Sequence, residues 1–222
     1  MTILRRSCAS NLLYKKLISL FYKYYITIVY YHNTMAPNSF SELSYKITKI
    51  ISKKEKQDDG IYFTPPKTVI RCIELLAAAT FNNILEPSCG SCEFIEKLKV
   101  CYPEATITGV EYNKTVYENI RKAYGAYHDN NANIKIIEGD FLTDAQTGFA
   151  DAPKFDLIIG NPPYYVMKKA DVKSDYYDYF DGRPNIFLLF IIKSLTLLTD
   201  DGILCFVLVL RLVEKGSSAG VK

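Results

Sequence analysis

The stretch Ile158-Ile159-Gly160-Asn161-Pro162-Pro163-Tyr164 decides how this chain is organised. The apolar run that leads into it, Phe155 to Ile159 with only Asp156 interrupting, predicts a short buried strand. Proline cannot donate a hydrogen bond to a sheet, so the two prolines predict that the strand ends in a stiff loop.

The loop presents acceptors and an aromatic ring at one place. Asn161 offers a side-chain carbonyl, Pro162 a backbone carbonyl whose position its ring restricts, and Tyr164 a flat face. An exocyclic amine on an aromatic ring is a poor nucleophile, because its lone pair is delocalised into the ring. Two acceptors on its N–H bonds would localise that lone pair. Taken alone, the tetrapeptide is also compatible with a proline-stiffened loop that has no catalytic role.

Upstream, a strand at 83–86 runs into the loop Pro87-Ser88-Cys89-Gly90-Ser91-Cys92, and a helix follows at 93–100. Strand, glycine-bearing turn and helix form the first unit of a doubly wound sheet. The backbone N–H groups of such a loop favour a carboxylate or a phosphate.

Two further strands end in acidic residues. The strand at 105–110 ends at Glu111, which is placed to accept the hydroxyls of a ribose, although an exposed strand-end glutamate is the alternative. The strand at 133–138 is followed by Asp140, a candidate acceptor for an adenine amino group, and Phe141, a candidate ring partner. The proposed ligand groups thus all follow strands, and parallel strands bring them to one edge.

The remaining pattern completes an alternation of strands and helices. Helices are expected at 38–57, 67–79 and 185–198, an extended segment at 61–66, and a fifth strand at 203–210. Residues 171–182 are acidic and aromatic, which suits either a mobile lid or a solvated loop. The fold class predicted is α/β, a Rossmann-like, mostly parallel sheet with helices on both faces.

Composition and charge limit the function classes. The 222 residues are 49% hydrophobic and 23% charged, enough for one sizeable domain. Residues 1–60 carry ten Lys or Arg against four Asp or Glu, whereas residues 61–222 carry 17 against 20. Nucleic-acid affinity would therefore need a local patch, and a solvated surface also explains the basic head.

The N-terminal part differs from the rest. The apolar run Leu17 to Tyr31 contains Lys23 and is short for a membrane span. We therefore expect an intracellular, cytoplasmic protein that does not associate with a membrane. A signal-anchor and a functional start at Met35 are the alternatives. We expect 1–37 to be an extension that is non-native or disordered, 38–210 the catalytic domain, and 211–222 a tail.

Six cysteines are present. Cys89 and Cys92 form a CxxC without a second pair or a nearby histidine, so no metal site is predicted. Cys72, Cys101 and Cys205 lie among apolar residues and are expected to fill the core in reduced form.

These motifs in this order resemble the S-adenosylmethionine-dependent adenine-N6 DNA methyltransferases with the gamma-type motif order, over roughly residues 60–210. The likeness rests on Tyr62-Phe63-Thr64-Pro65, on Glu86-Pro87-Ser88-Cys89-Gly90-Ser91-Cys92-Glu93-Phe94, on Glu111, on Gly139-Asp140-Phe141, and on Asn161-Pro162-Pro163-Tyr164. The resemblance implies that S-adenosyl-L-methionine is bound by Tyr62, Phe63, Thr64, Pro65, Glu86, Pro87, Ser88, Cys89, Gly90, Phe94, Glu111, Asp140, Phe141 and Asn161. It implies that Asn161, Pro162, Pro163 and Tyr164 are catalytic.

The resemblance also implies a mechanism. An adenine is flipped out of DNA, Tyr164 stacks on it, and Asn161 and the Pro162 carbonyl accept from its N6 amino group, which attacks the sulfonium methyl without a metal. A modification or restriction-modification system is the expected setting. Protein glutamine N5 methylation of the release-factor type is the runner-up. A catalytically defective fragment that only binds cofactor is the third possibility.

The sequence departs from the family pattern in two places. Cys92 stands where the family has glycine, and we expect its side chain to crowd the methionine end of the cofactor. The final strands and the target-recognition domain are also expected to be absent. The chain would then be inactive alone, or completed by a separate recognition subunit or a missing C-terminal part.

Overall fold

The computed structural model describes residues 25–31, 40–130, 133–143, 147–149 and 153–209. Its strands are β1 (Tyr25–Tyr31), β2 (Asn83–Glu86), β3 (Thr106–Glu111), β4 (Ile134–Glu138), β5 (Phe155–Gly160) and β6 (Leu198–Val209). Its helices are α2 (Glu42–Ile50), α3 (Lys53–Asp58), α4 (Pro66–Glu74), α5 (Glu93–Cys101), α6 (Lys114–Asn130) and α8 (Ile186–Leu197), with short 3-10 turns at Lys169–Asp171 and Ser174–Tyr179.

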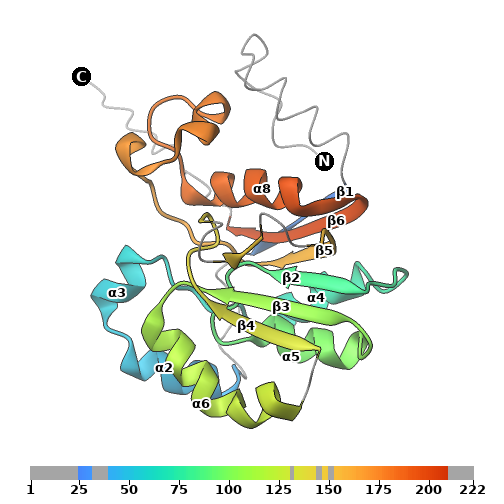
Figure 1. The fold of residues 1–222 in the computed structure, drawn as a ribbon. Coiled ribbons are helices and arrows are strands. Elements are labelled where there is room, and N and C mark those ends of the chain that lie inside the picture. The colour runs from blue at the N-terminus through green and yellow to red at the C-terminus, as the bar shows by residue number, and fades with distance from the viewer. Residues whose placement is uncertain (1–24, 32–39, 131–132, 144–146, 150–152, 210–222) are drawn as a thin grey trace, which may run out of the picture.

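The strands form one parallel sheet in the order β1-β6-β5-β2-β3-β4 (Figure 1). From β2 the chain moves outward through β3 to β4, and then returns to place β5 on the other side of β2. The order therefore reverses between β2 and β5, and open α/β sheets bind ligands at such a reversal. The predicted fold class is confirmed.

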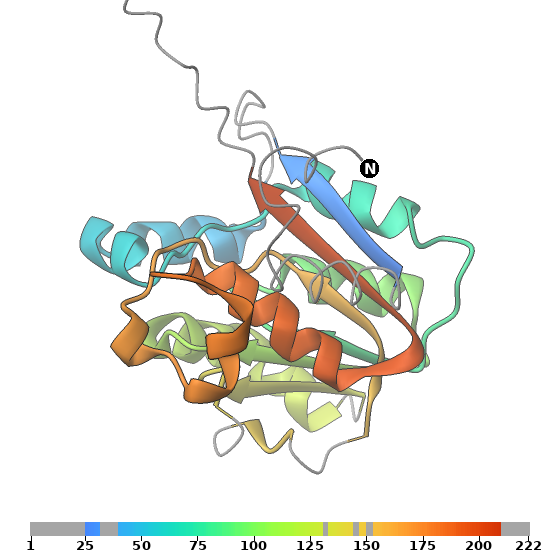
Figure 2. The same cartoon turned by 90° about the horizontal axis from the view of Figure 1, so that it is seen from above.

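Two apolar clusters cover the two faces of the sheet. One contains Ile84, Leu157 and Ile159 and packs against α2, α4, α5 and α6. The other contains the neighbouring residues Leu85 and Ile158 and packs against α8. Because successive strand residues point to opposite faces, the uninterrupted apolar sequence of β5 serves both clusters. Figure 2 shows α4 and α8 on opposite sides of β6.

Local signals fix where the helices begin. Ser52 and Glu55 form a capping box at α3, Pro66 occupies the first turn of α4, and the side chain of Asn185 accepts from the Phe187 amide at α8. Asp156, the one charge in the β5 run, accepts from the backbone amides of Asn82 and Asn83 and so joins β5 to the start of β2.

The largest difference from the sequence analysis is β1. Residues 25–31 pair with β6 from Tyr25 opposite Ile203 to Tyr31 opposite Val209, inside the segment expected to be an extension outside the catalytic domain. Residues 1–24 and 211–222 lie outside the described residues, so the expectations about them stay predictions.

The helix expected at 67–79 is shorter in the structure. α4 ends at Glu74, and the apolar side chains of Ile70 and Leu75 are exposed. Cys101 is exposed, whereas Cys72 and Cys205 lie in the core as expected. No helix in the described part of the chain combines the length and apolarity needed to cross a bilayer.

Candidate active site

The loops that follow β2 and β5 are adjacent at the point where the strand order reverses. The Ser88 hydroxyl donates to the backbone carbonyl of Asn161 over 3.0 Å. A Cβ placed on Gly160 would lie 3.5 Å from the Glu86 Cγ and the Pro87 Cδ, which is ordinary contact. The structure thus brings the glycine-bearing loop and the Asn-Pro-Pro-Tyr loop together, as the sequence predicted.

Hydrogen bonds hold the Asn161 side chain at both ends. Its amide nitrogen donates to the Tyr62 backbone carbonyl over 3.3 Å, and its carbonyl oxygen accepts from the Tyr164 hydroxyl over 2.7 Å. The Tyr164 hydroxyl also lies within hydrogen-bonding distance of the Val207 carbonyl on β6. A hydroxyl carries one proton, so it donates to one of these two acceptors at a time. No described residue donates a hydrogen bond to the Pro162 carbonyl.

The segment Tyr62 to Pro65 lies against the same two loops. Tyr62 reaches Asn161 through its carbonyl, and the Phe63 ring lies 3.3 Å from the position that a Cβ on Gly90 would take. Gly90 has a φ of +52°, so a side chain there would meet both backbone strain and the Phe63 ring. Thr64 is buried, and the Pro65 carbonyl accepts from the amides of Thr68 and Val69 at the start of α4.

Glu111 is held by the backbone on both carboxylate oxygens. One oxygen accepts from the Gly90 amide over 2.9 Å and the other from the Asn113 amide over 2.7 Å. Burial raises the pKa of Glu111 to about 7, although these two amide hydrogen bonds act to lower it. The carboxylate therefore joins the glycine loop to the turn after β3, and each oxygen keeps a second lone pair for a ligand.

Glu86 lies at the end of β2 and is only 2% exposed. Among the described residues, nothing hydrogen-bonds to its Oε2 atom. Burial raises the pKa of Glu86 well above its ordinary value, and the nearby Cys92 and Glu111 raise it further. A buried acceptor without a partner costs free energy, so this atom is suited to a donor supplied by a bound ligand.

An open pocket of about 550 Å³ lies at the ends of β3 and β4. Asp140 lines it, as the sequence predicted, and its two carboxylate oxygens accept from the Leu142 amide and the Thr143 hydroxyl, each over 2.9 Å. The other lining residues are Asp59, Tyr112, Asn113, Lys114, Glu138 and Gly139.

The sequence analysis gave no site role to five of these lining residues: Asp59, Tyr112, Asn113, Lys114 and Glu138. Tyr112 directly follows Glu111, is 63% exposed and lines the pocket. Asp59 comes from the end of α3, which lies beside this edge of the sheet (Figure 1). The exposed tyrosine follows a strand-end acid, so its position in the sequence could have indicated it. Nothing local indicates Asp59.

Two predicted cofactor residues lie in the core instead. Phe141 is 1% exposed, with its ring centroid 4.9 Å from that of Phe190 on α8. Phe94 is also 1% exposed and belongs to the cluster under α4 and α5. Phe141 directly follows Asp140 in the sequence. Asp140 lines the pocket, whereas the Phe141 side chain packs in the core. The structure does not bring either ring to the pocket.

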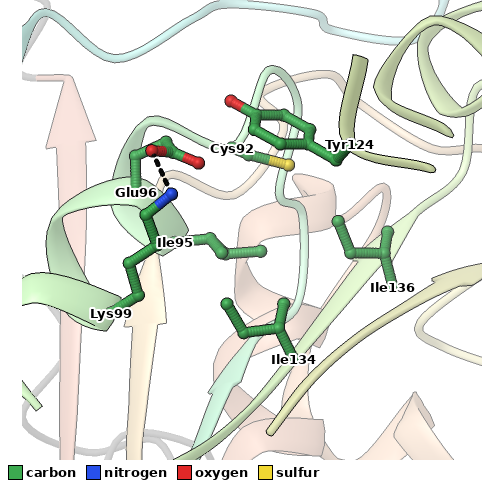
Figure 3. A pocket seen from close by; sticks show the side chains of 7 residues that line it. All are labelled: Cys92, Ile95, Glu96, Lys99, Tyr124, Ile134 and Ile136. Atoms are coloured by element: carbon green, nitrogen blue, oxygen red, sulfur yellow. Dashed lines mark ion pairs between the residues drawn. The ribbon is translucent and has the colours of Figure 1, made fainter. Parts of the chain in front are cut away.

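Cys92 also points away from the pocket. It has a φ of +66°, so it adopts the left-handed conformation that favours glycine. Its side chain is fully buried and contributes to a narrow cavity beneath α5 and α6 (Figure 3). There it lies beside the Tyr124 ring, above Ile134 and Ile136. The expectation that Cys92 crowds the cofactor is wrong, because the left-handed backbone turns its side chain into the core.

The chemistry of the remaining buried groups is limited. A hydrogen bond to Cys92 and burial raise the pKa of the Cys89 thiol well above its ordinary value, so this thiol is a poor nucleophile. Within the described ranges, no three His, Cys, Asp or Glu side chains are grouped so that they could hold a metal ion.

Residues 171–182 are packed onto the domain at three positions, although most of the segment is exposed. Val172, Tyr176 and Phe180 are buried in the cluster that contains α8, while Tyr177 stays exposed beside Lys169. The acidic residues between them hid this apolar spacing. The segment is therefore packed onto the domain next to the Asn-Pro-Pro-Tyr loop, which the Val166–Asn185 bridge also joins to α8.

A parallel sheet with this strand order and a glycine-bearing loop after its central strand is the fold of the Rossmann-like methyltransferases. A solved type I restriction-modification methyltransferase subunit from Streptococcus thermophilus has this fold, with a TM-score of 0.51 and 18% identity over 66% of this chain and 34% of its own. The sequence profile of the Eco57I restriction-modification methylases matches residues 94–221, more than half of the chain. The chain belongs to that family.

Named relatives agree with this assignment. The modification methylase CviBIII of Paramecium bursaria Chlorella virus NC1A is 35% identical over 182 residues, which are 78% of this chain and 44% of the relative. The type II methyltransferase M.CvrRI of Paramecium bursaria Chlorella virus XZ-6E is 36% identical over 76% of this chain and 41% of its own length. The chain thus spans less than half the length of these relatives.

Proposed function

We propose that this chain carries the catalytic site for transfer of a methyl group from S-adenosyl-L-methionine to the N6 amino group of adenine in DNA. The observation that carries the proposal is the set of acceptors at the end of β5. The Asn161 side chain is fixed by hydrogen bonds at both ends, the Pro162 carbonyl follows it, and the Tyr164 hydroxyl donates to the Asn161 carbonyl oxygen.

Two carbonyl acceptors side by side suit an amino group as the methyl acceptor. Asn161 and Pro162 would accept the two N–H bonds of the adenine amine and direct its lone pair outward. The Tyr164 hydroxyl donates to the Asn161 carbonyl oxygen, and its O–H can rotate to donate to the Val207 carbonyl instead when the amine arrives. The ring of Tyr164 would stack on a base flipped from the duplex.

The groups nearby fit the proposed cofactor. Glu86 offers a buried acceptor without a partner, Glu111 offers an acceptor lone pair on each oxygen, and Asp140 lines a pocket large enough for a nucleoside. The segment Tyr62 to Pro65 and the loop Pro87 to Gly90 would enclose the rest. S-adenosyl-L-methionine, when bound there, supplies an electrophilic methyl group. This chain's residues would position the acceptor amine.

The catalytic unit proposed here would not itself read the DNA sequence. Residues 61–222 carry a net charge of −3, and affinity for DNA comes mostly from phosphate contacts by Lys and Arg. We therefore propose that residues 38–210, with β1, act as a catalytic unit for which a recognition subunit or further sequence reads the DNA. Family membership and the named relatives favour DNA over a protein glutamine as substrate.

The test compares wild type with Asn161→Ala and with Asn82→Ala, which removes an exposed asparagine side chain at the opposite end of the sheet. Each protein is incubated with labelled S-adenosyl-L-methionine and unmethylated DNA of mixed sequence at low salt, and the DNA is digested to nucleosides. Because the proposal places DNA recognition outside the catalytic unit, the enzyme is used in excess of the DNA. N6-methyl-2′-deoxyadenosine should then form with wild type and Asn82→Ala only, while calorimetry shows cofactor binding in all three. Methyl on cytosine C5, or cofactor binding with no transfer to DNA even with excess enzyme, would refute the proposal.

A further inference from the structure

We propose that the two-residue turn Asp59-Gly60, at the end of α3, is a positioning element that fixes the Asn161–Tyr164 loop relative to the Glu111 side of the site. The inference rests on the function proposed above for that loop. Asp59 and Gly60 directly precede the segment that contains Tyr62 to Pro65, and they belong to none of the sequence motifs described above.

Gly60 is in direct contact with the loop. A Cβ on Gly60 would lie 3.1 Å from the Tyr165 Cδ1, 3.2 Å from the Pro163 Cβ and 3.2 Å from the Tyr164 backbone nitrogen. Two of these atoms belong to a proline ring and to backbone, neither of which can rotate away as the end of a flexible side chain can. The backbone of Gly60 therefore supports three successive residues of the loop.

The conformation of the turn also requires glycine. Gly60 has a φ of +63°, and the Ile61 amide donates to the Lys56 carbonyl over 3.0 Å, which closes α3 in a Schellman motif. The helix end thereby fixes the position of Gly60. A glycine that served only to end α3 would stabilise the fold without affecting the Asn161–Tyr164 loop. The structural role and the positioning role therefore predict different effects of substitution.

Asp59 joins the same turn to the cofactor side. Its Oδ2 accepts from the Asn113 side-chain nitrogen over 2.8 Å, and the Asn113 backbone amide donates to Glu111 over 2.7 Å. Glu111 in turn accepts from the Gly90 amide in the glycine-bearing loop. One turn thus touches the loop proposed to hold the target base and is hydrogen-bonded into the network proposed to hold the ribose.

The consequence is a defined effect of adding a methyl group at Gly60. The new Cβ would push Pro163 and the Tyr164 backbone by a few tenths of an ångström, and the Pro162 carbonyl and Asn161 would move with them. Transfer between two bound groups is sensitive to such shifts, because the reacting atoms must lie close and aligned.

A matched control exists in the chain. Gly182 has a φ of +75°, and a Cβ placed there would meet nothing within 4 Å. Gly182→Ala therefore imposes the same left-handed strain without a contact. Gly60→Asn is a second variant, since asparagine tolerates this backbone region better than alanine while bringing the same Cβ.

The experiment measures thermal unfolding, amide hydrogen exchange of the peptide that spans residues 158–167, cofactor affinity and methyl transfer. Gly60→Ala and Gly60→Asn should exchange faster than wild type in that peptide, and should lose at least tenfold in kcat with cofactor affinity within threefold of wild type. Gly182→Ala should lose stability to a similar extent but keep wild-type exchange and kcat.

Unchanged exchange in both Gly60 variants would overturn the inference, whether or not the protein transfers methyl groups. Equal loss of kcat in Gly60→Ala and Gly182→Ala would overturn it too. Absence of transfer by wild type would count against the proposed function alone, because the exchange measurement needs no turnover.

Discussion

Replacing Glu111 by glutamine should remove a large part of the pH dependence of stability. Burial raises the pKa of Glu111 from 4.5 to about 7 in the folded protein. Below pH 4.5 the group is protonated in both states, and its contribution to stability is complete. Between pH 4.5 and 7 the unfolded chain releases the proton while the folded chain keeps it, so stability falls as pH rises.

The size of the effect follows from the shift. One pKa unit corresponds to about 1.4 kcal/mol, so the loss is about 3 kcal/mol and is complete above pH 7. Glutamine has no such titration. It has only one carbonyl oxygen for the Gly90 and Asn113 amides, so one amide loses its acceptor at a cost of about 1–3 kcal/mol that is independent of pH.

The assay is urea unfolding followed by circular dichroism at pH values from 4.5 to 8.5, for wild type and Glu111→Gln. Wild type should be the more stable at pH 4.5, and its advantage should shrink by about 3 kcal/mol by pH 8. Glu86 also has a raised pKa, but it is present in both proteins and largely cancels in the difference. Glu138→Gln, which removes an exposed carboxyl opposite Glu111 on β4, should not reproduce the effect. A difference that stays constant across this pH range would refute the reasoning.

Three further substitutions test the Asn-Pro-Pro-Tyr loop and the turn at Cys92. Tyr164→Phe should lower the free energy of unfolding by about 0.5–1.5 kcal/mol through loss of its hydroxyl hydrogen bond, yet keep methyl transfer within tenfold because the ring remains. Tyr164→Ala should lose about 1–3 kcal/mol of stacking on the base, measured as kcat/KM on DNA, and equal activities of the two variants would exclude stacking. Cys92→Gly should leave cofactor affinity, measured by calorimetry, within twofold, because the side chain points into the core. Its free energy of unfolding should change by less than about 1 kcal/mol, since relief of left-handed strain offsets the lost thiol packing.

Local signals in the sequence were sufficient for most of the fold. The apolar run of β5 and the prolines after it mark a strand end, and the glycine-bearing loop after β2 marks a strand-to-helix turn. Parallel pairing then brings such ends to one edge, which is why Glu111, Asp140 and Asn161 were predicted to share it. Their roles toward a cofactor and a base stay predictions.

The features that were missed depend on contacts between distant parts of the chain. An aromatic residue within a motif serves the core as readily as a ligand, so the sequence could not distinguish Phe94 and Phe141 from ring partners. Asp59 becomes a pocket residue only because the end of α3 meets the turn after β3. The left-handed backbone that turns the Cys92 side chain into the core is likewise a property of the folded loop.

The pairing of β1 with β6 has a consequence for synthesis and folding. Tyr25 pairs with Ile203, about 180 positions later, so these are among the least local contacts in the sheet. At a translation rate of roughly 5–20 residues per second, the segment Tyr25 to Tyr31 leaves the ribosome on the order of ten to forty seconds before its partner strand exists. During that interval its apolar, β-branched sequence has no native strand beside it, which favours capture by a chaperone or by another nascent chain. The last step in completing this sheet is therefore expected to be the return of the first strand.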